Sequence, residues 1–455
     1  MTPRLWIAEN TERLLQRLQD FLRFPSISAH PTHRSDLQRT AEWLRGFLSR
    51  MGFEVELLGD PPTVYAHYAG PEGAPTLLFY GHYDVQPPDP LELWVSPPFE
   101  PQIRDGAIYA RGACDDKGQV FAHLGAWEYF IETQGQLPLS LHVLIEGEEE
   151  TGSETLYSLL KEGREKWKSD AVIVSDTAFF AEDIPTLTVG LRGLLYAEIR
   201  VRGPQRDLHS GSLGGIVENP ALALAYILTA LKGRDGRVRI PGFYQGIQAP
   251  DAQERQLWRS LPANEEYYRK LTGSPSLAGE VGFTPLERVS IRPTLDVNGM
   301  KSGYTGIGAK TIIPAEASAK VSMRLVPGQD PESIWAAFRA YVQAISPAGV
   351  EIEIERLHEA APAFETPTNS PFYKIAEEAV ETAFGRRPIP LREGGSIPIL
   401  HTLREVAGGC PVILMGFGLP TDAVHSPNEH FRLDQLWKGM EAAIEWYRRA
   451  AAVNK

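Results

Sequence analysis

Short apolar runs alternate with helical patterns in the first part of this chain, and metal-binding side chains follow several of these runs. Residues 76–80, 139–145 and 171–175 are typical of buried strands, whereas residues 118–133 have helical spacing. Strands separated by helices favour a mostly parallel sheet with helices packed against it. We therefore predict an α/β fold, in which ligands bind beyond the carboxyl ends of the strands.

The pattern changes near residue 188 and changes back after residue 360. Between these points, residues 194–201, 315–325 and 350–357 are typical of strands. Residues 220–231 and 330–345 are typical of helices. A chain of 455 residues also exceeds the size that one hydrophobic core usually serves. We predict a discontinuous domain (1–187 and 361–455) with a mostly parallel sheet, which carries the chemistry, and a separate inserted α+β domain (188–360).

The candidate metal ligands are two imidazoles and several carboxylates, spread over more than three hundred residues. They are His82 with Asp84, Asp115 with Asp116, Glu149 with Glu150, Asp176, and His425. His82 can bind a metal ion through one ring nitrogen while Asp84 hydrogen-bonds the other. Of the adjacent Glu149 and Glu150, one can bind a cation while its neighbour transfers a proton.

Each of these motifs has an ordinary structural explanation when it is taken alone. Asp115 and Asp116 are also typical of a helix N-cap, and Asp176 is typical of a turn. The glutamate run is compatible with a solvated loop, and His425 with a loop histidine. Several coincidences in one chain explain the pattern less well than a single centre for divalent cations does.

The charge and composition of the chain argue against two classes of partner, nucleic acids and membranes. A net charge of −13 and the absence of a basic cluster interleaved with aromatic residues argue against nucleic-acid binding. No run approaches the roughly 20 apolar residues that a membrane span requires. The two cysteines form no disulfide framework, and the N-terminal residues lack a signal-peptide pattern. We expect a cytoplasmic protein without nucleic-acid or membrane partners.

The candidate ligands lie in motifs that resemble a known enzyme family, the dinuclear zinc peptidases. That family contains glutamate carboxypeptidase, aminoacylase, succinyl-diaminopimelate desuccinylase and the cytosolic and carnosine dipeptidases. The matching segments are Gly-His82-Tyr-Asp84-Val-Gln-Pro, Arg-Gly-Ala-Cys-Asp115-Asp116-Lys-Gly, Glu149-Glu150-Thr-Gly-Ser, Ser-Asp176, Asp-Leu-His209-Ser-Gly, Gly-Ala-Lys-Thr311-Ile-Ile-Pro, Arg324-Leu-Val-Pro, Glu-Gly-Gly-Ser396-Ile-Pro and His425-Ser-Pro-Asn-Glu. The later segments are most similar to the cytosolic nonspecific dipeptidase and carnosine dipeptidase branch.

The resemblance implies a role for each ligand and two divalent metal ions per chain. Asp115 would bridge the two ions, His82 and Asp176 would complete one site, and Glu150 and His425 would complete the other. Glu149 would be the general base and acid. Zinc suits these ligands, and manganese or cobalt also fits a site rich in carboxylates. The family further implies a cis peptide between Asp115 and Asp116.

Four residues of the inserted domain and its surroundings are implied to bind substrate. Arg324, supported by Thr311 and Ser396, would bind the C-terminal carboxylate of a peptide, for which a guanidinium group is well shaped. His209 would act from the partner subunit of a homodimer and stabilise the developing oxyanion. Without the resemblance, a surface ion pair explains Arg324 equally well, and a surface loop explains His209 better.

These inferences predict a dipeptidase that hydrolyses dipeptides or short peptides with a free C-terminal carboxylate. The resemblance also implies that the inserted domain (188–360) is a lid and dimerisation domain, whose closure over the catalytic domain (1–187 and 361–455) would exclude water from the substrate. One alternative is a deacylase that uses the same metal chemistry on N-acyl amino acids. A second is a non-catalytic peptide-binding protein, against which the intact set of ligands and Glu149 argues.

Overall fold

The computed structural model describes residues 1–250, 252–357 and 360–453, and these divide into two compact units. Unit 1 comprises Met1–Val189, Thr366–Leu391 and the segment from Ile399 onward. Unit 2 comprises Gly190–Glu365 and Arg392–Pro398. The α/β class predicted from the sequence is confirmed, and the lid and dimerisation roles expected of the inserted segment stay predictions.

Unit 1 is built on a mixed sheet with the strand order β1-β2-β6-β3-β7-β17-β8. Its strands are β1 (Glu54–Leu58), β2 (Thr63–Tyr68), β3 (Thr76–His82), β6 (Ser140–Glu146), β7 (Ala171–Val174), β8 (Thr186–Leu191) and β17 (Val412–Leu414). The central strands β6, β3, β7 and β17 are parallel, whereas β1, β2 and β8 pair antiparallel. Strand β16 (Ile389–Glu393) also pairs with β8. The last two residues of β8, Gly190 and Leu191, belong to unit 2 and pair with β15 (Phe364–Glu365) of the same unit.

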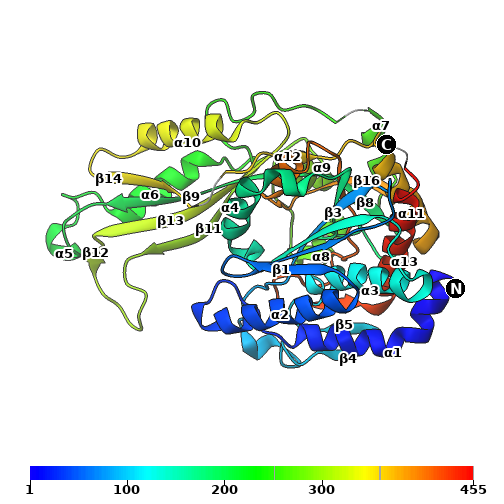
Figure 1. The fold of residues 1–455 in the computed structure, drawn as a ribbon. Helices are drawn as coiled ribbons and strands as arrows, with labels where there is room; N and C mark the ends of the chain where they lie inside the picture. Colours follow the sequence, from blue (N-terminus) through cyan, green and yellow to red (C-terminus); the bar gives the residue numbers. More distant parts are fainter. Residues whose placement is uncertain (251, 358–359, 454–455) are drawn as a thin grey trace. The chain divides into compact units, whose positions relative to one another are not determined.

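Helices cover both faces of this sheet (Figure 1). They are α1 (Pro3–Leu22), α2 (Arg34–Arg50), α3 (Lys117–Gln134), α4 (Glu154–Glu162), α11 (Pro371–Phe384), α12 (Leu400–Val406) and α13 (Leu433–Ala450). Helix α3 is buried around its whole circumference from Lys117 to Phe130, as expected of a helix that is apolar on all sides. It packs against α1 and α13 and forms the centre of the core of unit 1.

A small antiparallel sheet in unit 1 joins segments that are far apart in the sequence. Strand β5 (Ala107–Tyr109) lies between β4 (Gln102–Arg104) and β18 (His430–Arg432). The loop that leads from β5 into α3 therefore runs beside the segment that precedes β18. These two segments carry Asp115 and His425.

Unit 2 contains a four-stranded antiparallel sheet with the order β11-β13-β9-β14. Its strands are β9 (Gly193–Arg202), β11 (Thr294–Ser302), β13 (Glu316–Leu325) and β14 (Glu351–Arg356). Side chains of β9 and β13 alternate between buried and less buried positions, and the buried ones pack under α6 (Pro220–Leu231) and α10 (Pro331–Ile345). This alternation is the period of two expected for a sheet with one covered face.

The remaining elements of unit 2 are short. They are β10 (Leu208–His209), β12 (Ile312–Ile313), α5 (Ser210–Leu213), α7 (Ala252–Trp258), α8 (Glu265–Thr272) and α9 (Pro285–Ser290). Strands β10 and β12 pair antiparallel. Within the described residues of both units, no helix combines the length and the apolar composition that a membrane span requires.

Candidate metal centre

The candidate ligands of unit 1 gather at the carboxyl ends of its parallel strands. His82 is the last residue of β3, and the 3-10 helix η3 (Glu149–Thr151) follows β6. Asp176 lies just beyond β7, whereas Asp115 and His425 come from the two loops that the small sheet brings together. Open α/β sheets bind ligands at this edge because the loops there diverge above the strand ends.

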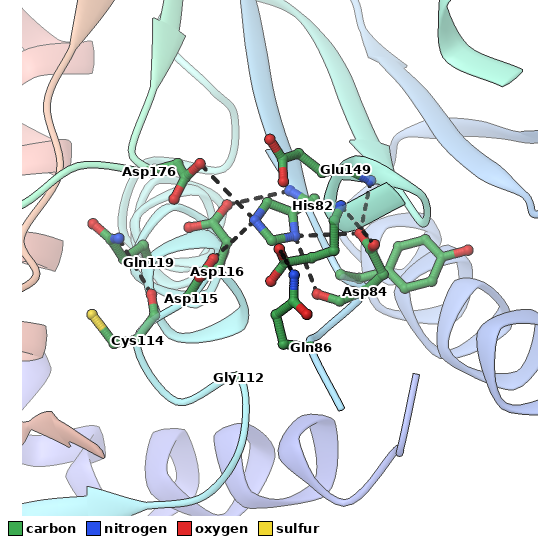
Figure 2. Close-up of polar contacts among 12 residues, drawn as sticks. His82, Asp84, Gln86, Gly112, Cys114, Asp115, Asp116, Gln119, Glu149 and Asp176 are labelled. Atoms are coloured by element: carbon green, nitrogen blue, oxygen red, sulfur yellow. Dashed lines mark hydrogen bonds and ion pairs between the residues drawn. The ribbon is translucent and has the colours of Figure 1, made fainter. Parts of the chain in front are cut away.

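Three of these side chains form a first cluster around the His82 ring, seen in Figure 2. The Nε2 atom of His82 lies 3.1 Å from Oδ1 of Asp115 and 4.0 Å from Oδ2 of Asp176. The donor atoms of these three residues all lie within 4.8 Å of one another. They can therefore bind the same cation.

A second cluster shares Asp115 with the first. The Nε2 atom of His425 lies 2.8 Å from Oδ2 of Asp115 and 3.3 Å from Oε1 of Glu150. These donor atoms also lie within 4.8 Å of one another. Oδ1 of Asp115 thus faces His82 while Oδ2 faces His425, so the two clusters meet at this one carboxylate.

Asp84 orients both His82 and the turn that carries the two glutamates. Nδ1 of His82 lies 3.1 Å from the backbone carbonyl oxygen of Asp84 and 3.3 Å from its Oδ1 atom, so Nε2 is the ring nitrogen that faces the cluster. The backbone N–H groups of Glu149 and Glu150 donate to the two carboxylate oxygens of Asp84, at 3.1 and 3.0 Å. Asp84 is fully buried, so this one residue fixes the His82 ring through its carbonyl and the two glutamate N–H groups through its carboxylate.

The carboxylates of the centre are buried close to one another, and burial and proximity shift their pKa values. Burial raises the pKa of Glu149 well above its usual value, and the nearby Asp176 adds to the rise. Burial also raises the pKa of Asp176, which lies beside Asp115. For Asp115 burial acts the same way, but the neighbouring imidazoles of His425 and His82 bring its pKa below the usual range. Bound divalent cations would neutralise this charge without protons.

The donor atoms fit divalent metal ions. Nε2 of His82 and Oε1 of Glu150 are buried and make no hydrogen bond within the part of the chain that the structure describes. Imidazole nitrogen and carboxylate oxygen are ligands of zinc, and carboxylate-rich sites also accept manganese. The peptide between Asp115 and Asp116 is cis, as the family resemblance predicted.

Comparison with known proteins agrees with this centre. The model of peptidase family M20/M25/M40 matches residues 78–449. The chain belongs to this family. The M20/M25/M40 peptidases are metal-dependent, and this chain is therefore a metal-dependent hydrolase of the peptidase class.

Full-length relatives of this M20/M25/M40 member are dipeptidases by name. Cys-Gly metallodipeptidase DUG1 of Candida albicans is 31% identical over 471 residues, which cover 98% of this chain and 96% of the relative. Beta-Ala-His dipeptidase of Homo sapiens is 28% identical over 447 residues, covering 93% and 87% of the two chains. The solved structure of dipeptidase Dug1p from Saccharomyces cerevisiae matches with a TM-score of 0.89 at 27% identity, covering 100% of this chain and 98% of Dug1p. The predicted resemblance is confirmed.

One polar residue beside the centre escaped the sequence prediction. Nε2 of Gln86 donates a 2.7 Å hydrogen bond to Oε2 of Glu150, which turns the other oxygen of that carboxylate toward His425. His82, Asp84 and Gln86 are spaced by two residues, so their side chains leave an extended backbone on one side. That spacing is the signal that could have identified Gln86.

Unit 2 brings the predicted substrate-binding residues together in two pairs. His209 ends β10 opposite Ile312 of β12, and the carbonyl of Thr311 accepts from the N–H of Ser210 at 3.0 Å. Arg324 of β13 donates a 2.7 Å hydrogen bond to Oγ of Ser396. His209 therefore lies beside Thr311, and Arg324 beside Ser396.

The sequence left a surface ion pair as the alternative role of Arg324, and the structure does not contain that ion pair in the part of the chain that it describes. Among the described residues, no carboxylate lies within ion-pairing distance of its guanidinium group. Burial lowers the pKa of Arg324, although the nearby Asp296 opposes this effect. A half-buried guanidinium without a bound carboxylate is suited to an anionic ligand.

Proposed function

We propose that this M20/M25/M40 family member is a metal-dependent dipeptidase, acting on dipeptides or short peptides with a free C-terminal carboxylate. The observation that carries the proposal is the shared position of Asp115 between the clusters of His82 and His425. The names of the full-length relatives support the same substrate class.

The proposed ligands are those of the two clusters. His82, Asp115 and Asp176 would hold one ion, and Asp115, Glu150 and His425 the other. When bound, two divalent ions polarise a peptide carbonyl and lower the pKa of the attacking water. We propose zinc as the ion, with manganese and cobalt as competitors for the same ligands.

Glu149 is the proposed general base and acid. Glu149 lies beside the ligands but belongs to neither cluster, so its carboxylate can transfer a proton instead of binding an ion. The N–H of Glu149 is fixed by Asp84, which orients the side chain beside the ligands. Glu149 would take the proton of the attacking water and pass it to the leaving amine.

Arg324 is proposed to bind the substrate carboxylate, with Ser396 and Thr311 in support. We predict that Arg324→Gln raises KM for free dipeptides about 10- to 100-fold, because a charged hydrogen bond contributes about 1.5–3 kcal/mol. Steady-state kinetics on a dipeptide and on its C-terminal amide check this. Because the amide has no carboxylate for Arg324 to bind, the wild-type protein and Arg324→Gln should cleave it equally slowly. Arg202→Gln, which breaks an exposed ion pair with Glu353, is the control. It should change the KM neither for the dipeptide nor for the amide. Equal losses on the acid and the amide would contradict the role.

His209 is proposed to act as an oxyanion donor from the partner subunit of a homodimer. Its Nδ1 accepts from the N–H of Gly211 at 3.1 Å, so the neutral ring carries its proton on the exposed Nε2. We predict that His209→Ala lowers kcat about 10²–10³-fold, the usual effect of losing one oxyanion donor. Mixing this variant with Glu149→Ala should restore activity, because each mixed dimer contains one complete set of residues.

Two results would contradict the dimer. One is a mixture with no more activity than its separate components, under conditions where subunits exchange. The other is a wild-type protein that sediments as a monomer and keeps full activity. We also propose a cytoplasmic location, which two free cysteines support.

The competing deacylase function makes a different kinetic prediction. We expect the protein to cleave unmodified dipeptides with a kcat/KM well above that for N-acetyl and N-succinyl amino acids of the same C-terminal residue. The reverse preference would replace the dipeptidase proposal with the deacylase alternative. No turnover of either class by metal-loaded protein would favour a peptide-binding protein.

A further inference from the structure

The buried carboxylate of Glu429 accepts four hydrogen bonds from a single loop. Its Oε2 atom accepts from Nη1 of Arg111 at 2.7 Å and from the N–H of Gly112 at 3.0 Å. Its Oε1 atom accepts from the N–H groups of Cys114 and Asp115, at 3.0 and 3.1 Å. Glu429 is 1% exposed, so this carboxylate has exchanged water almost entirely for protein donors.

The four donors belong to the loop that carries Asp115, whereas Glu429 belongs to the segment that carries His425. Strands β5 and β18 continue into these segments, and the N–H of Ala110 still donates to the carbonyl of Glu429 at 3.1 Å. Strand pairing therefore aligns the two segments, but it ends before Asp115. Beyond the last strand pair, the side chain of Glu429 links the two segments through its hydrogen bonds to Cys114 and Asp115.

The loop is shaped around this carboxylate. Gly112 has φ +82°, a backbone conformation that side chains rarely adopt, and a Cβ atom there would lie 2.7 Å from Val85. Within the described residues, the N–H groups of Cys114 and Asp115 have no acceptor other than Glu429. Successive N–H groups that converge on one anion fix the backbone that carries them.

Arg111 extends the same connection to a third segment. Its guanidinium group, 1% exposed, donates to Glu429 and also to the carbonyl of Pro87 at 3.2 Å. Pro87 directly follows Gln86, whose side chain orients Glu150. The carboxylate of Glu429 and its arginine thus hold the segments of Asp115, His425 and Gln86 against one another.

We propose that Glu429 is a positioning residue of the metal centre, which sets the separation between Asp115 and His425 that a shared cation requires. The inference rests on the metal-ligand roles proposed for those two residues. Partners that orient metal ligands typically contribute about 10- to 100-fold to metal affinity. A residue that only stabilises the fold would not have this effect on the folded protein.

Glu429→Gln tests the proposal because it keeps the size of the side chain. The amide oxygen can accept from one pair of donors, but the amide nitrogen then faces the other pair. Glu280→Gln is the matched control: Glu280 is also buried and also paired with arginines, Arg237 and Arg292, but it lies in unit 2. Both variants remove a buried carboxylate from an arginine.

The measurement is zinc affinity of the metal-free full-length proteins, by titration against a competing chelator, with circular dichroism to establish folding. We expect the dissociation constant of Glu429→Gln to rise about 10- to 100-fold and that of Glu280→Gln to stay at the wild-type value. Wild-type affinity in folded Glu429→Gln would overturn the proposal, as would an equal rise in both variants. Wild-type protein that binds no zinc would instead count against the proposed function.

A second measurement does not depend on the folding of a variant. Hydrogen exchange of the metal-free wild-type protein reports on the N–H groups of Cys114 and Asp115, which Glu429 binds. The proposal predicts slow exchange at both positions before any metal is added. Exchange as fast as in an unstructured loop would show that the metal orders this loop, and would overturn the proposal.

Discussion

Replacing Glu149 with glutamine is expected to lower kcat for dipeptide hydrolysis about 10²–10⁴-fold, the usual contribution of a general acid–base group. Glutamine keeps the shape and the backbone hydrogen bond to Asp84, but it cannot take a proton from water or return one to an amine. Because Glu149 belongs to neither ligand cluster, metal content should stay at the wild-type level. Elemental analysis and steady-state kinetics on the same preparation check both expectations.

The neighbouring Glu148 provides the control. It accepts a 2.8 Å hydrogen bond from the N–H of Thr155 near the start of α4, and it belongs to neither metal cluster. Glu148→Gln should therefore change kcat far less than Glu149→Gln does. Equal losses in the two variants would point to a general disturbance of this turn, and full activity of Glu149→Gln would contradict its role as base.

Replacing Asp115 with asparagine is expected to remove metal from both clusters at once. An amide offers one neutral oxygen in place of two charged ones, while the imidazoles of His82 and His425 face opposite oxygens of Asp115. Since bound cations supply several kcal/mol of transition-state stabilisation, kcat/KM should fall at least about 10³-fold. The measurement is metal content after dialysis, together with dipeptide hydrolysis.

Comparison with His425→Ala tests whether Asp115 binds both ions or only one. His425 belongs to the second cluster alone, so its loss should weaken one site and leave the cluster of His82, Asp115 and Asp176 able to bind an ion. If Asp115→Asn loses no more metal than His425→Ala, Asp115 does not bridge two ions, and the proposed dinuclear centre is wrong.

Local sequence signals predicted the metal centre because each ligand follows an apolar strand or lies within a short motif. The helix Pro220–Leu231 has the bounds predicted for it from the sequence. Such signals need no knowledge of the rest of the chain. The family and the α/β class could therefore be predicted without a structure.

Elements that depend on distant contacts were not predicted. Strand β11 carries exposed polar residues, a glycine and a bulge, so it lacks the alternation that marks a strand. The segment Arg392–Pro398 groups with unit 2 rather than with its sequence neighbours, because Arg192 donates to the carbonyl of Gly394 and accepts from Ser396. Glu429 lies in a recognised motif, but its four donors come from more than three hundred residues away.

Metal content and activity of the wild-type protein, measured together through a cycle of chelation and reconstitution, test the central claim most directly. The account predicts two divalent ions per chain, loss of dipeptide hydrolysis when both are removed, and recovery when zinc or manganese is returned. Dipeptide hydrolysis that persists in metal-free protein would contradict the account, and so would a chain that binds no divalent ion under any condition.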